Sequence, residues 1–341
     1  MSRWLLVTQD FPPGFTGGIA SWAVDLALAL QGADHDVTVL ARHTGPTTDA
    51  DAAWPFAVVR VRGRSWGNWQ GLWAALAVWP RLDGQTRVIC ATWQLATILV
   101  RSLRGARLGV AFHGSDLTRL TAAPPTLHRV ARSATALLPV SRFLAGELRR
   151  LLPEEDLPVT VLPMPIAAPS EPTGPWRKEL VFLARLTPLK GVDRAISIAR
   201  ALQRPLVVIG DGVALPALKA AASQAPITFT GRLPREEALA GLERAAAILL
   251  LPRVDEDGTG AEGLGLCLIE AALRQTPAIG CATGGVPEAI GPGLLLTDPD
   301  HPDLDAIRAL LDDPDAGPRA RQHALAHHGP QAALAALLSA L

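Results

Sequence analysis

The sequence predicts an α/β protein of two doubly wound domains that face one another across a cleft. Two observations predict this class. Short apolar runs of β type alternate with longer helical patterns along the chain, and one proline-rich break divides the alternation into halves of similar size. Continuous apolar strands separated by helices are typical of parallel sheets that are covered on both faces. A chain of 341 residues is long enough for two such cores.

The expected elements follow one another in a regular order. In the first half, the pattern predicts strands at residues 4–8, 36–41, 57–62, 87–91, 108–113, 136–140 and 159–163, and helices at 20–31, 70–80, 94–103 and 141–152. In the second half, it predicts strands at 179–184, 205–210, 227–231, 247–252 and 277–281, and helices at 190–202, 213–223, 235–245, 264–274, 303–312 and 318–326. Ligands of such sheets bind beyond the carboxyl ends of the strands.

The break between the halves predicts a linker. Five prolines fall within residues 163–175. Proline removes a hydrogen-bond donor and fixes φ, so neither a helix nor a central strand runs through this segment. We therefore expect a first domain at 1–165, a linker at 166–178 and a second domain at 179–328. A last helix is expected at 329–341, after the break at Gly329-Pro330.

The charge and cysteine content exclude several classes of protein. The formal net charge is zero, which argues against a general nucleic-acid binder. Residues 1–165 hold 16 arginines and 12 acidic residues, a net charge of +4 that suits an acidic surface or substrate. The three scattered cysteines predict neither a disulfide framework nor a metal site. With no signal peptide and no long apolar stretch, we expect a cytoplasmic protein that meets a membrane only from the side, at its inner face.

The segment Glu262-Gly-Leu-Gly-Leu-Cys-Leu-Ile-Glu270 carries the clearest chemistry. It follows an expected strand and opens a helix. Gly263 and Gly265 allow close backbone approach, and amides at a helix start favour a phosphate. Carboxylates such as Glu262 and Glu270 bind sugar hydroxyls well, because each accepts two or more hydrogen bonds. From the spacing alone, a loop with two solvated glutamates remains the alternative.

This segment, followed by Thr283-Gly284-Gly285-Val286-Pro287-Glu288, resembles the E-x7-E signature of retaining GT-B glycosyltransferases of family 4. The resemblance covers nearly the whole chain and implies the GT-B fold of two Rossmann-like domains, with a last helix that often crosses back to the first domain. It implies that Glu262 contacts the donor sugar and Glu270 the nucleotide ribose. The amides near Gly265 and Leu266 would stabilise charge on the leaving phosphate.

A second match is Phe182-Leu-Ala-Arg185-Leu-Thr-Pro-Leu-Lys190-Gly191, at the end of the first strand after the linker. The family resemblance implies that Arg185 and Lys190 neutralise the departing nucleoside diphosphate, one as a fork and one as a point charge. Without the resemblance, a surface arginine and a lysine at a helix start would be the alternative.

Two further strand ends resemble family loops beside the nucleotide base and phosphates. One contains Gly210 and Asp211, and the other contains Leu233. Each is a weak signal, since Gly-Asp-Gly is also ordinary turn chemistry.

In the first half, Gly17 and Gly18 precede a helix and resemble the N-terminal glycine loop of the phosphatidylinositol mannosyltransferase-like branch. His113 ends an expected strand in Phe112-His-Gly-Ser-Asp116. The resemblance implies that His113 acts on the donor sugar or the reacting region; a core histidine is the alternative. We expect Asp116 to cap the following helix.

Tryptophans and arginines crowd the stretch 54–79. A membrane interface, an acceptor sugar and an ordinary buried face all fit this composition. The residues are Trp54, Trp66, Trp69, Trp73 and Trp79 with Arg60, Arg62 and Arg64. The acidic run 255–257 lacks the other ligands of a calcium loop and is expected to be an exposed loop.

The resemblance therefore implies a retaining transferase that moves a hexose from a nucleoside-diphosphate sugar to a hydroxyl of a glycan or a lipid-linked acceptor. It implies no metal and no cofactor beyond this co-substrate. One departure is the linker Val161-Leu-Pro-Met-Pro-Ile166, which lacks the usual Gly-Val-Asp. Two alternatives stay open on the same fold: a nucleotide-sugar 2-epimerase and a non-catalytic sugar-nucleotide-binding protein.

Overall fold

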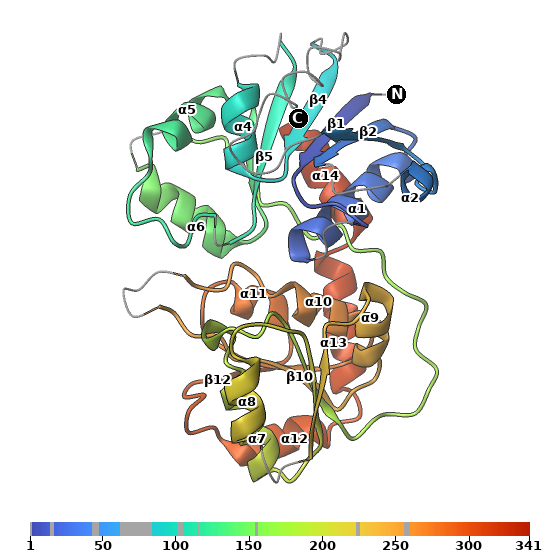
Figure 1. The fold of residues 1–341 in the computed structure, drawn as a ribbon, viewed down its shortest axis with the longest axis vertical. Coiled ribbons are helices and arrows are strands. Elements are labelled where there is room, and N and C mark those ends of the chain that lie inside the picture. The colour runs from blue at the N-terminus through green and yellow to red at the C-terminus, as the bar shows by residue number, and fades with distance from the viewer. Residues whose placement is uncertain are drawn as a thin grey trace. The chain divides into compact units, whose positions relative to one another are not determined.

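The computed structural model describes residues 2–13, 17–42, 48–61, 84–100, 105–114, 116–153, 156–222, 226–255 and 260–341. The chain forms two compact units, Met1–Ala167 with His328–Leu341, and Ala168–His327. Each is built on a six-stranded sheet, coloured blue to green in unit 1 and green to orange in unit 2 (Figure 1). This confirms the predicted α/β class with two doubly wound parallel sheets.

The sheet of unit 1 has the strand order β3-β2-β1-β4-β5-β6, and all its neighbours pair in parallel. Its strands are β1 (Arg3–Thr8), β2 (Asp36–Arg42), β3 (Ala57–Val61), β4 (Thr86–Cys90), β5 (Arg107–Phe112) and β6 (Ala136–Pro139). Its helices include α1 (Gly18–Gly32), α2 (Thr48–Ala52), α4 (Trp93–Leu99), α5 (Pro125–Ser133), α6 (Arg142–Leu151) and α14 (Pro330–Ala340). The strand order reverses between β1 and β4, and ligands of doubly wound sheets bind at such a switch point.

Two expected elements of unit 1 need comment. The strand predicted at 159–163 is wrong: Val159 forms an isolated bridge to Leu137. The amides of Thr160 and Leu162 donate to carbonyl oxygens of β6, but a regular ladder would also need an amide donor at Pro139, and proline has none. The helix predicted at 70–80 lies outside the described residues.

Helix α14 returns to the core of unit 1 although it follows the last helix of unit 2. It packs against α1, and its Ala333 and Leu337 are fully buried. The carbonyl oxygen of Leu341 accepts hydrogen bonds from Arg87 (3.1 Å) and Arg107 (2.6 Å), at the start of β4 and β5. These contacts join α14 to the sheet as well as to α1.

The sheet of unit 2 has the order β12-β11-β10-β7-β8-β9, again with parallel pairing. Its strands are β7 (Leu180–Leu183), β8 (Leu206–Ile209), β9 (Ile227–Gly231), β10 (Ala247–Leu250), β11 (Ala278–Cys281) and β12 (Leu294–Leu296). A 3-10 turn, η1 (Pro188–Lys190), precedes the helices α7 (Val192–Ala201), α8 (Leu215–Ala221), α9 (Arg235–Leu242), α10 (Leu266–Ala272), α11 (Val286–Ile290), α12 (Leu304–Leu311) and α13 (Ala316–His327). Fully buried side chains such as Phe182, Val208 and Leu249 fill its core.

Part of the tryptophan- and arginine-rich stretch is packed within unit 1. The Arg60 side chain is 6% exposed and binds both carboxylate oxygens of Asp51, at 2.6 and 2.9 Å. It also donates to the carbonyl oxygens of Phe11 and Pro12. Trp54 stacks on Phe56 with 5.6 Å between ring centroids. Residues 62–79, which include Arg62, Arg64 and the other four tryptophans, lie outside the described residues. In the described part of the chain, no helix is long and apolar enough to cross a bilayer.

Candidate functional site

Lys190 and Glu262, two predicted donor-site residues far apart in the sequence, form an ion pair in unit 2. The Lys190 Nζ donates to Oε2 of Glu262, and their side chains are 30% and 13% exposed. Lys190 ends the η1 turn beyond β7, and Glu262 lies on the segment between β10 and α10. Since β7 and β10 are neighbours in a parallel sheet, their carboxyl ends bring these two side chains together.

Glu270 lies within α10, the helix that follows Glu262 in the sequence. Its side chain is 7% exposed and pairs with Arg235, whose Nη1 lies 2.9 Å from Oε1. Burial and the nearby carboxylates of Glu262 and Glu270 together raise the pKa of the Cys267 thiol above its ordinary range. The Cys267 thiol, at the start of α10, is therefore protonated at neutral pH.

Arg235 is a site residue that the sequence analysis missed. It begins α9, two residues after Leu233, and α9 packs against α10. Its neighbour Leu233 lies in a loop that resembles family loops beside the nucleotide, but no motif marks Arg235 itself. Leu233 itself is half-buried and lies between β9 and α9.

Two glycines hold the Glu262 segment in place. A Cβ atom on Gly284 would lie 2.1 Å from the Glu262 carbonyl oxygen, and one on Gly285 would lie 2.3 Å from the Gly263 carbonyl oxygen. The amide of Gly285 donates to the Glu262 carbonyl oxygen at 2.8 Å. The turn after β11 is thus pressed against the chain that carries Glu262. Gly265, with φ at 93°, then leads into α10 at Leu266.

The other predicted residues of unit 2 lie at the ends of β7 and β8. Arg185 is exposed, and its side chain bonds to none of the described residues. The exposed Asp211 accepts from the amide of Gly212 at 2.7 Å, and its carbonyl oxygen accepts from the amide of Leu186 at 2.9 Å. Gly210 donates its amide to a carbonyl oxygen at the end of β9, 2.9 Å away. The Gly-Asp-Gly turn therefore packs beside Arg185, whereas Lys190 rather than Arg185 contacts Glu262.

In unit 1, His113 lies just beyond the carboxyl end of β5. Its ring forms a T-shaped pair with buried Trp22 of α1, with 4.6 Å between centroids and 74° between planes. Burial lowers the pKa of His113 to about 4, against a smaller opposing effect of the Ala91 carbonyl. The ring is therefore neutral at pH 7. Its Nε2 is buried and has no partner among the described residues.

Asp116 does not cap a following helix as predicted. Its Oδ1 accepts from two preceding amides, those of His113 (3.1 Å) and Gly114 (2.8 Å), and the next helix begins only at Pro125. Burial raises the pKa of Asp116 to about 6. The carboxylate thus shapes the turn that presents His113.

Several other buried polar atoms near this turn have no partner among the described residues. They lie after β4, on the turn after β5 and on α1: Thr92 Oγ1, Gln94 Oε1, Asp116 Oδ2, Thr118 Oγ1 and Trp22 Nε1. Buried polar groups are normally paired, so such a group of orphan atoms points to a polar ligand or to ordered water. Gly18 begins α1 and Gly17 is its N-cap, where a Cβ atom would meet nothing within 4 Å.

Comparison with known proteins decides the family. A model described as "Glycosyl transferases group 1" matches residues 177–313, and one described as "Glycosyltransferase Family 4" matches residues 16–168. The GDP-mannose-dependent alpha-(1-6)-phosphatidylinositol monomannoside mannosyltransferase of Mycobacterium tuberculosis is 30% identical over 336 residues, which cover 85% of this chain and 83% of that protein. The chain belongs to glycosyltransferase family 4.

One further sequence relative agrees with that assignment, and two solved structures share the fold. The glycogen synthase of Mycobacterium tuberculosis is 28% identical over 93% of this chain and 88% of that protein. Anabaena HepE, solved with UDP and glucose, has a TM-score of 0.76 at 14% identity and covers both chains fully. AviGT4, of avilamycin A biosynthesis, has a TM-score of 0.73 at 19% identity over 100% of this chain and 97% of its own. The GT-B fold and hexosyl transfer from a nucleotide sugar are confirmed.

The lowered pKa of His113 predicts how the stability of the glycosyltransferase depends on pH. An ordinary histidine has a pKa of 6.5, so between pH 6.5 and about 4 the unfolded chain binds a proton that the folded chain does not. This term lowers the free energy of unfolding as pH falls through that window, by about 1–2 kcal/mol between pH 7 and 5. Denaturant unfolding of the wild type and of His113→Gln at both values measures it. The raised pKa of Asp116 acts in the opposite sense but is present in both proteins. If the wild type and His113→Gln lose the same free energy of unfolding between pH 7 and 5, the lowered pKa of His113 is contradicted.

Proposed function

We propose that this glycosyltransferase moves a mannosyl group from GDP-mannose to a hydroxyl of a lipid-linked mannoside, with retention of anomeric configuration. Relatives from Mycobacterium tuberculosis, Mycolicibacterium smegmatis and Corynebacterium glutamicum are named as GDP-mannose-dependent mannosyltransferases that act on phosphatidylinositol mannosides. All the named relatives are transferases or synthases, which favours transfer over the epimerase alternative. The observation that carries the proposal is the Lys190–Glu262 pair, with Glu270 buried in the helix that follows Glu262.

Transfer from a nucleotide sugar requires a cation near the diphosphate and hydrogen-bonding groups for the sugar and for the ribose. As the bond between the sugar and the diphosphate breaks, the sugar gains oxocarbenium character and negative charge builds on the leaving phosphate. Lys190, which Glu262 neutralises in the free protein, would then share its charge with the diphosphate, and exposed Arg185 would add a second cation. Glu262 would accept hydrogen bonds from the sugar hydroxyls, and Glu270 from the ribose.

The same proposal gives His113 a role as a hydrogen-bond acceptor. A neutral ring with an unpartnered, buried Nε2 suits a hydroxyl group better than a phosphate, because only the protonated ring would attract an anion. We propose that this hydroxyl belongs to the donor sugar or to the reacting region. Gly17 and Gly18, at the start of α1, would let the backbone approach the donor closely.

A thermal-shift screen with GDP, UDP and ADP tests the donor. We expect GDP to stabilise the protein most, and a ligand at 100 times its Kd adds about 2.7 kcal/mol to the free energy of unfolding. GDP-mannose with phosphatidylinositol mannosides then tests transfer, read as release of GDP and as the anomer of the product. Stabilisation by UDP or ADP alone would overturn the donor base, and an inverted product would overturn retention.

A further inference from the structure

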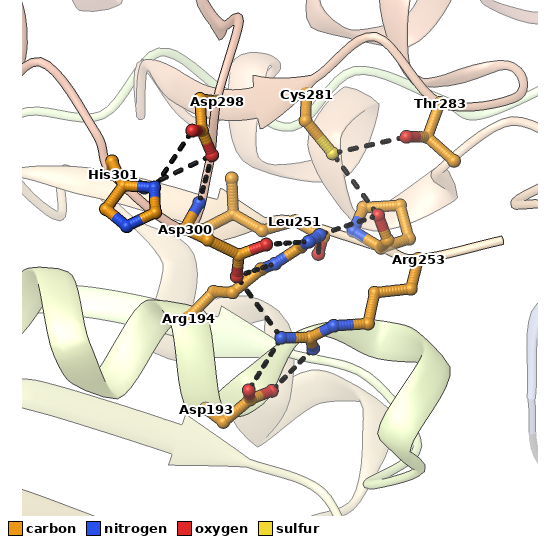
Figure 2. Close-up of polar contacts among 10 residues, drawn as sticks. Asp193, Arg194, Leu251, Arg253, Cys281, Thr283, Asp298, Asp300 and His301 are labelled. Carbon is orange, nitrogen blue, oxygen red and sulfur yellow. Dashed lines mark hydrogen bonds and ion pairs between the residues drawn. The ribbon is translucent and has the colours of Figure 1, made fainter.

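A cluster of arginines and aspartates lies at the carboxyl end of β10 (Figure 2). Arg194, in the first turn of α7, donates Nη1 to the carbonyl oxygens of Leu251 (3.2 Å) and Pro252 (3.3 Å). The same guanidinium binds both carboxylate oxygens of Asp300, with 2.8 Å from Nε and 2.6 Å from Nη2. Its side chain is 12% exposed. One planar group therefore joins α7, the end of β10 and the loop between β12 and α12.

Arg253 connects the same cluster to the turn that carries Lys190. Its amide donates to the carbonyl oxygen of Leu189 at 2.8 Å, one residue before Lys190. Its guanidinium binds both carboxylate oxygens of Asp193, at 2.8 and 2.7 Å, and lies 3.4 Å from Asp300. The segment after β10 and the η1–α7 segment are thus joined through both backbone and side chains.

The Pro252 carbonyl extends the cluster toward the Glu262 segment. Besides Arg194, it accepts from the Cys281 thiol, 3.3 Å away, and this thiol lies 3.5 Å from the hydroxyl of Thr283. Thr283 begins the turn whose two glycines press against the chain at Glu262. The cluster therefore contacts the turn that carries Lys190 and also the turn that packs against the Glu262 segment.

The carboxylate that holds Arg194 is itself fixed. Oδ1 of Asp298 accepts from the amides of Asp300 (3.0 Å) and His301 (3.2 Å), which sets the loop between β12 and α12. The hydrogen bond from Arg194 holds the pKa of Asp300 below its usual range, so Asp300 is ionised at neutral pH.

We propose that Arg194 is a positioning residue for the donor site, which fixes the turn bearing Lys190 against the segment bearing Glu262. The inference rests on the donor site proposed above. Charge-assisted, bidentate hydrogen bonds fix both distance and direction, and small displacements of a positioned charge weaken binding strongly. A lysine at 194 would not reproduce the arrangement, because an ammonium group cannot bind a carboxylate as a fork while also donating to two carbonyl oxygens.

A double-mutant cycle with GDP as the probe tests this role. The Kd of GDP is measured by calorimetry for the wild type, Arg194→Gln, Lys190→Ala and the double variant. We expect Arg194→Gln to weaken GDP binding ~10-fold when Lys190 is present and less than ~2-fold in the Lys190→Ala background. A residue that acts only by positioning Lys190 has little effect once Lys190 is removed. Equal factors in the two backgrounds, or unchanged affinity of Arg194→Gln, would overturn the positioning role. Normal GDP affinity of Lys190→Ala would overturn the donor site, and the positioning role with it.

Matched variants separate positioning from general loss of structure. Arg319 forms a more exposed pair with Asp313 near the start of α13, so Arg319→Gln removes an arginine–aspartate pair outside the cluster and should leave the Kd of GDP unchanged. Arg194→Lys should recover only part of the affinity. If Arg194→Gln does not fold, as judged by circular dichroism, Asp300→Asn takes its place in the cycle, with a smaller expected loss and the same dependence on Lys190. Full affinity of Asp300→Asn would then contradict the proposal.

Discussion

Lys190→Ala is expected to lower kcat/KM for transfer by about 10²–10³-fold, because it removes a preorganised charge that faces the leaving diphosphate. Glu262→Gln should lose activity for a different reason: it removes the carboxylate that orients both Lys190 and the donor sugar. The two side chains are partly exposed, so each change should cost only about 1–2 kcal/mol of the free energy of unfolding. Rates with GDP-mannose and the acceptor proposed above, and denaturant unfolding, give both quantities.

A control for Lys190→Ala is Lys219→Ala, which removes an exposed lysine near the end of α8. It should leave kcat/KM unchanged. Lys190→Arg should recover part of the activity, since it keeps the charge and changes its geometry. Near-normal turnover of both Lys190→Ala and Glu262→Gln would show that the chemistry lies elsewhere.

The fold was predictable from the sequence because both sheets are parallel and their central strands are buried on both faces. Such strands read as continuous apolar runs, as in Leu-Val-Phe-Leu of β7, and their helices separate them clearly. Where a proline of the neighbouring strand removes a ladder donor, as Pro139 does beside residues 159–163, the same signal misleads. The short strand β12 and the helix α5 were not predicted; α5 has only three buried residues, and β12 only one.

The candidate site was predictable only where its residues lie in recognisable segments. The spacing of Glu262 and Glu270 and the family loop with Lys190 are local patterns. The contact between Lys190 and Glu262 is not local, because it depends on β7 and β10 being neighbours. Arg235 and Arg194 were missed for the same reason: each meets its acidic partner only after the chain has folded, and no spacing in the sequence announces it.

Gly285→Ala should reduce kcat/KM by about 10²-fold, although residue 285 contributes no side chain to the site. The new Cβ atom would lie 2.3 Å from the Gly263 carbonyl oxygen and 2.7 Å from the Leu264 Cα, and both are backbone atoms. The segment that carries Glu262 must therefore move away. The φ of Gly285 is −85°, which alanine adopts easily, so the effect is steric and not conformational.

The measurement pairs kcat/KM with the free energy of unfolding, which should fall by about 1–3 kcal/mol as in other overpacked sites. Gly146→Ala is the matched control, since a Cβ atom on this exposed residue of α6 meets nothing within 4 Å. It should keep full activity and gain up to about 1 kcal/mol, because alanine favours a helix more than glycine does. A Gly285→Ala enzyme with wild-type kcat/KM would mean that the position of the Glu262 backbone does not control transfer. If kcat/KM falls while the free energy of unfolding changes little, the contact between the β11 turn and the Glu262 segment controls transfer directly.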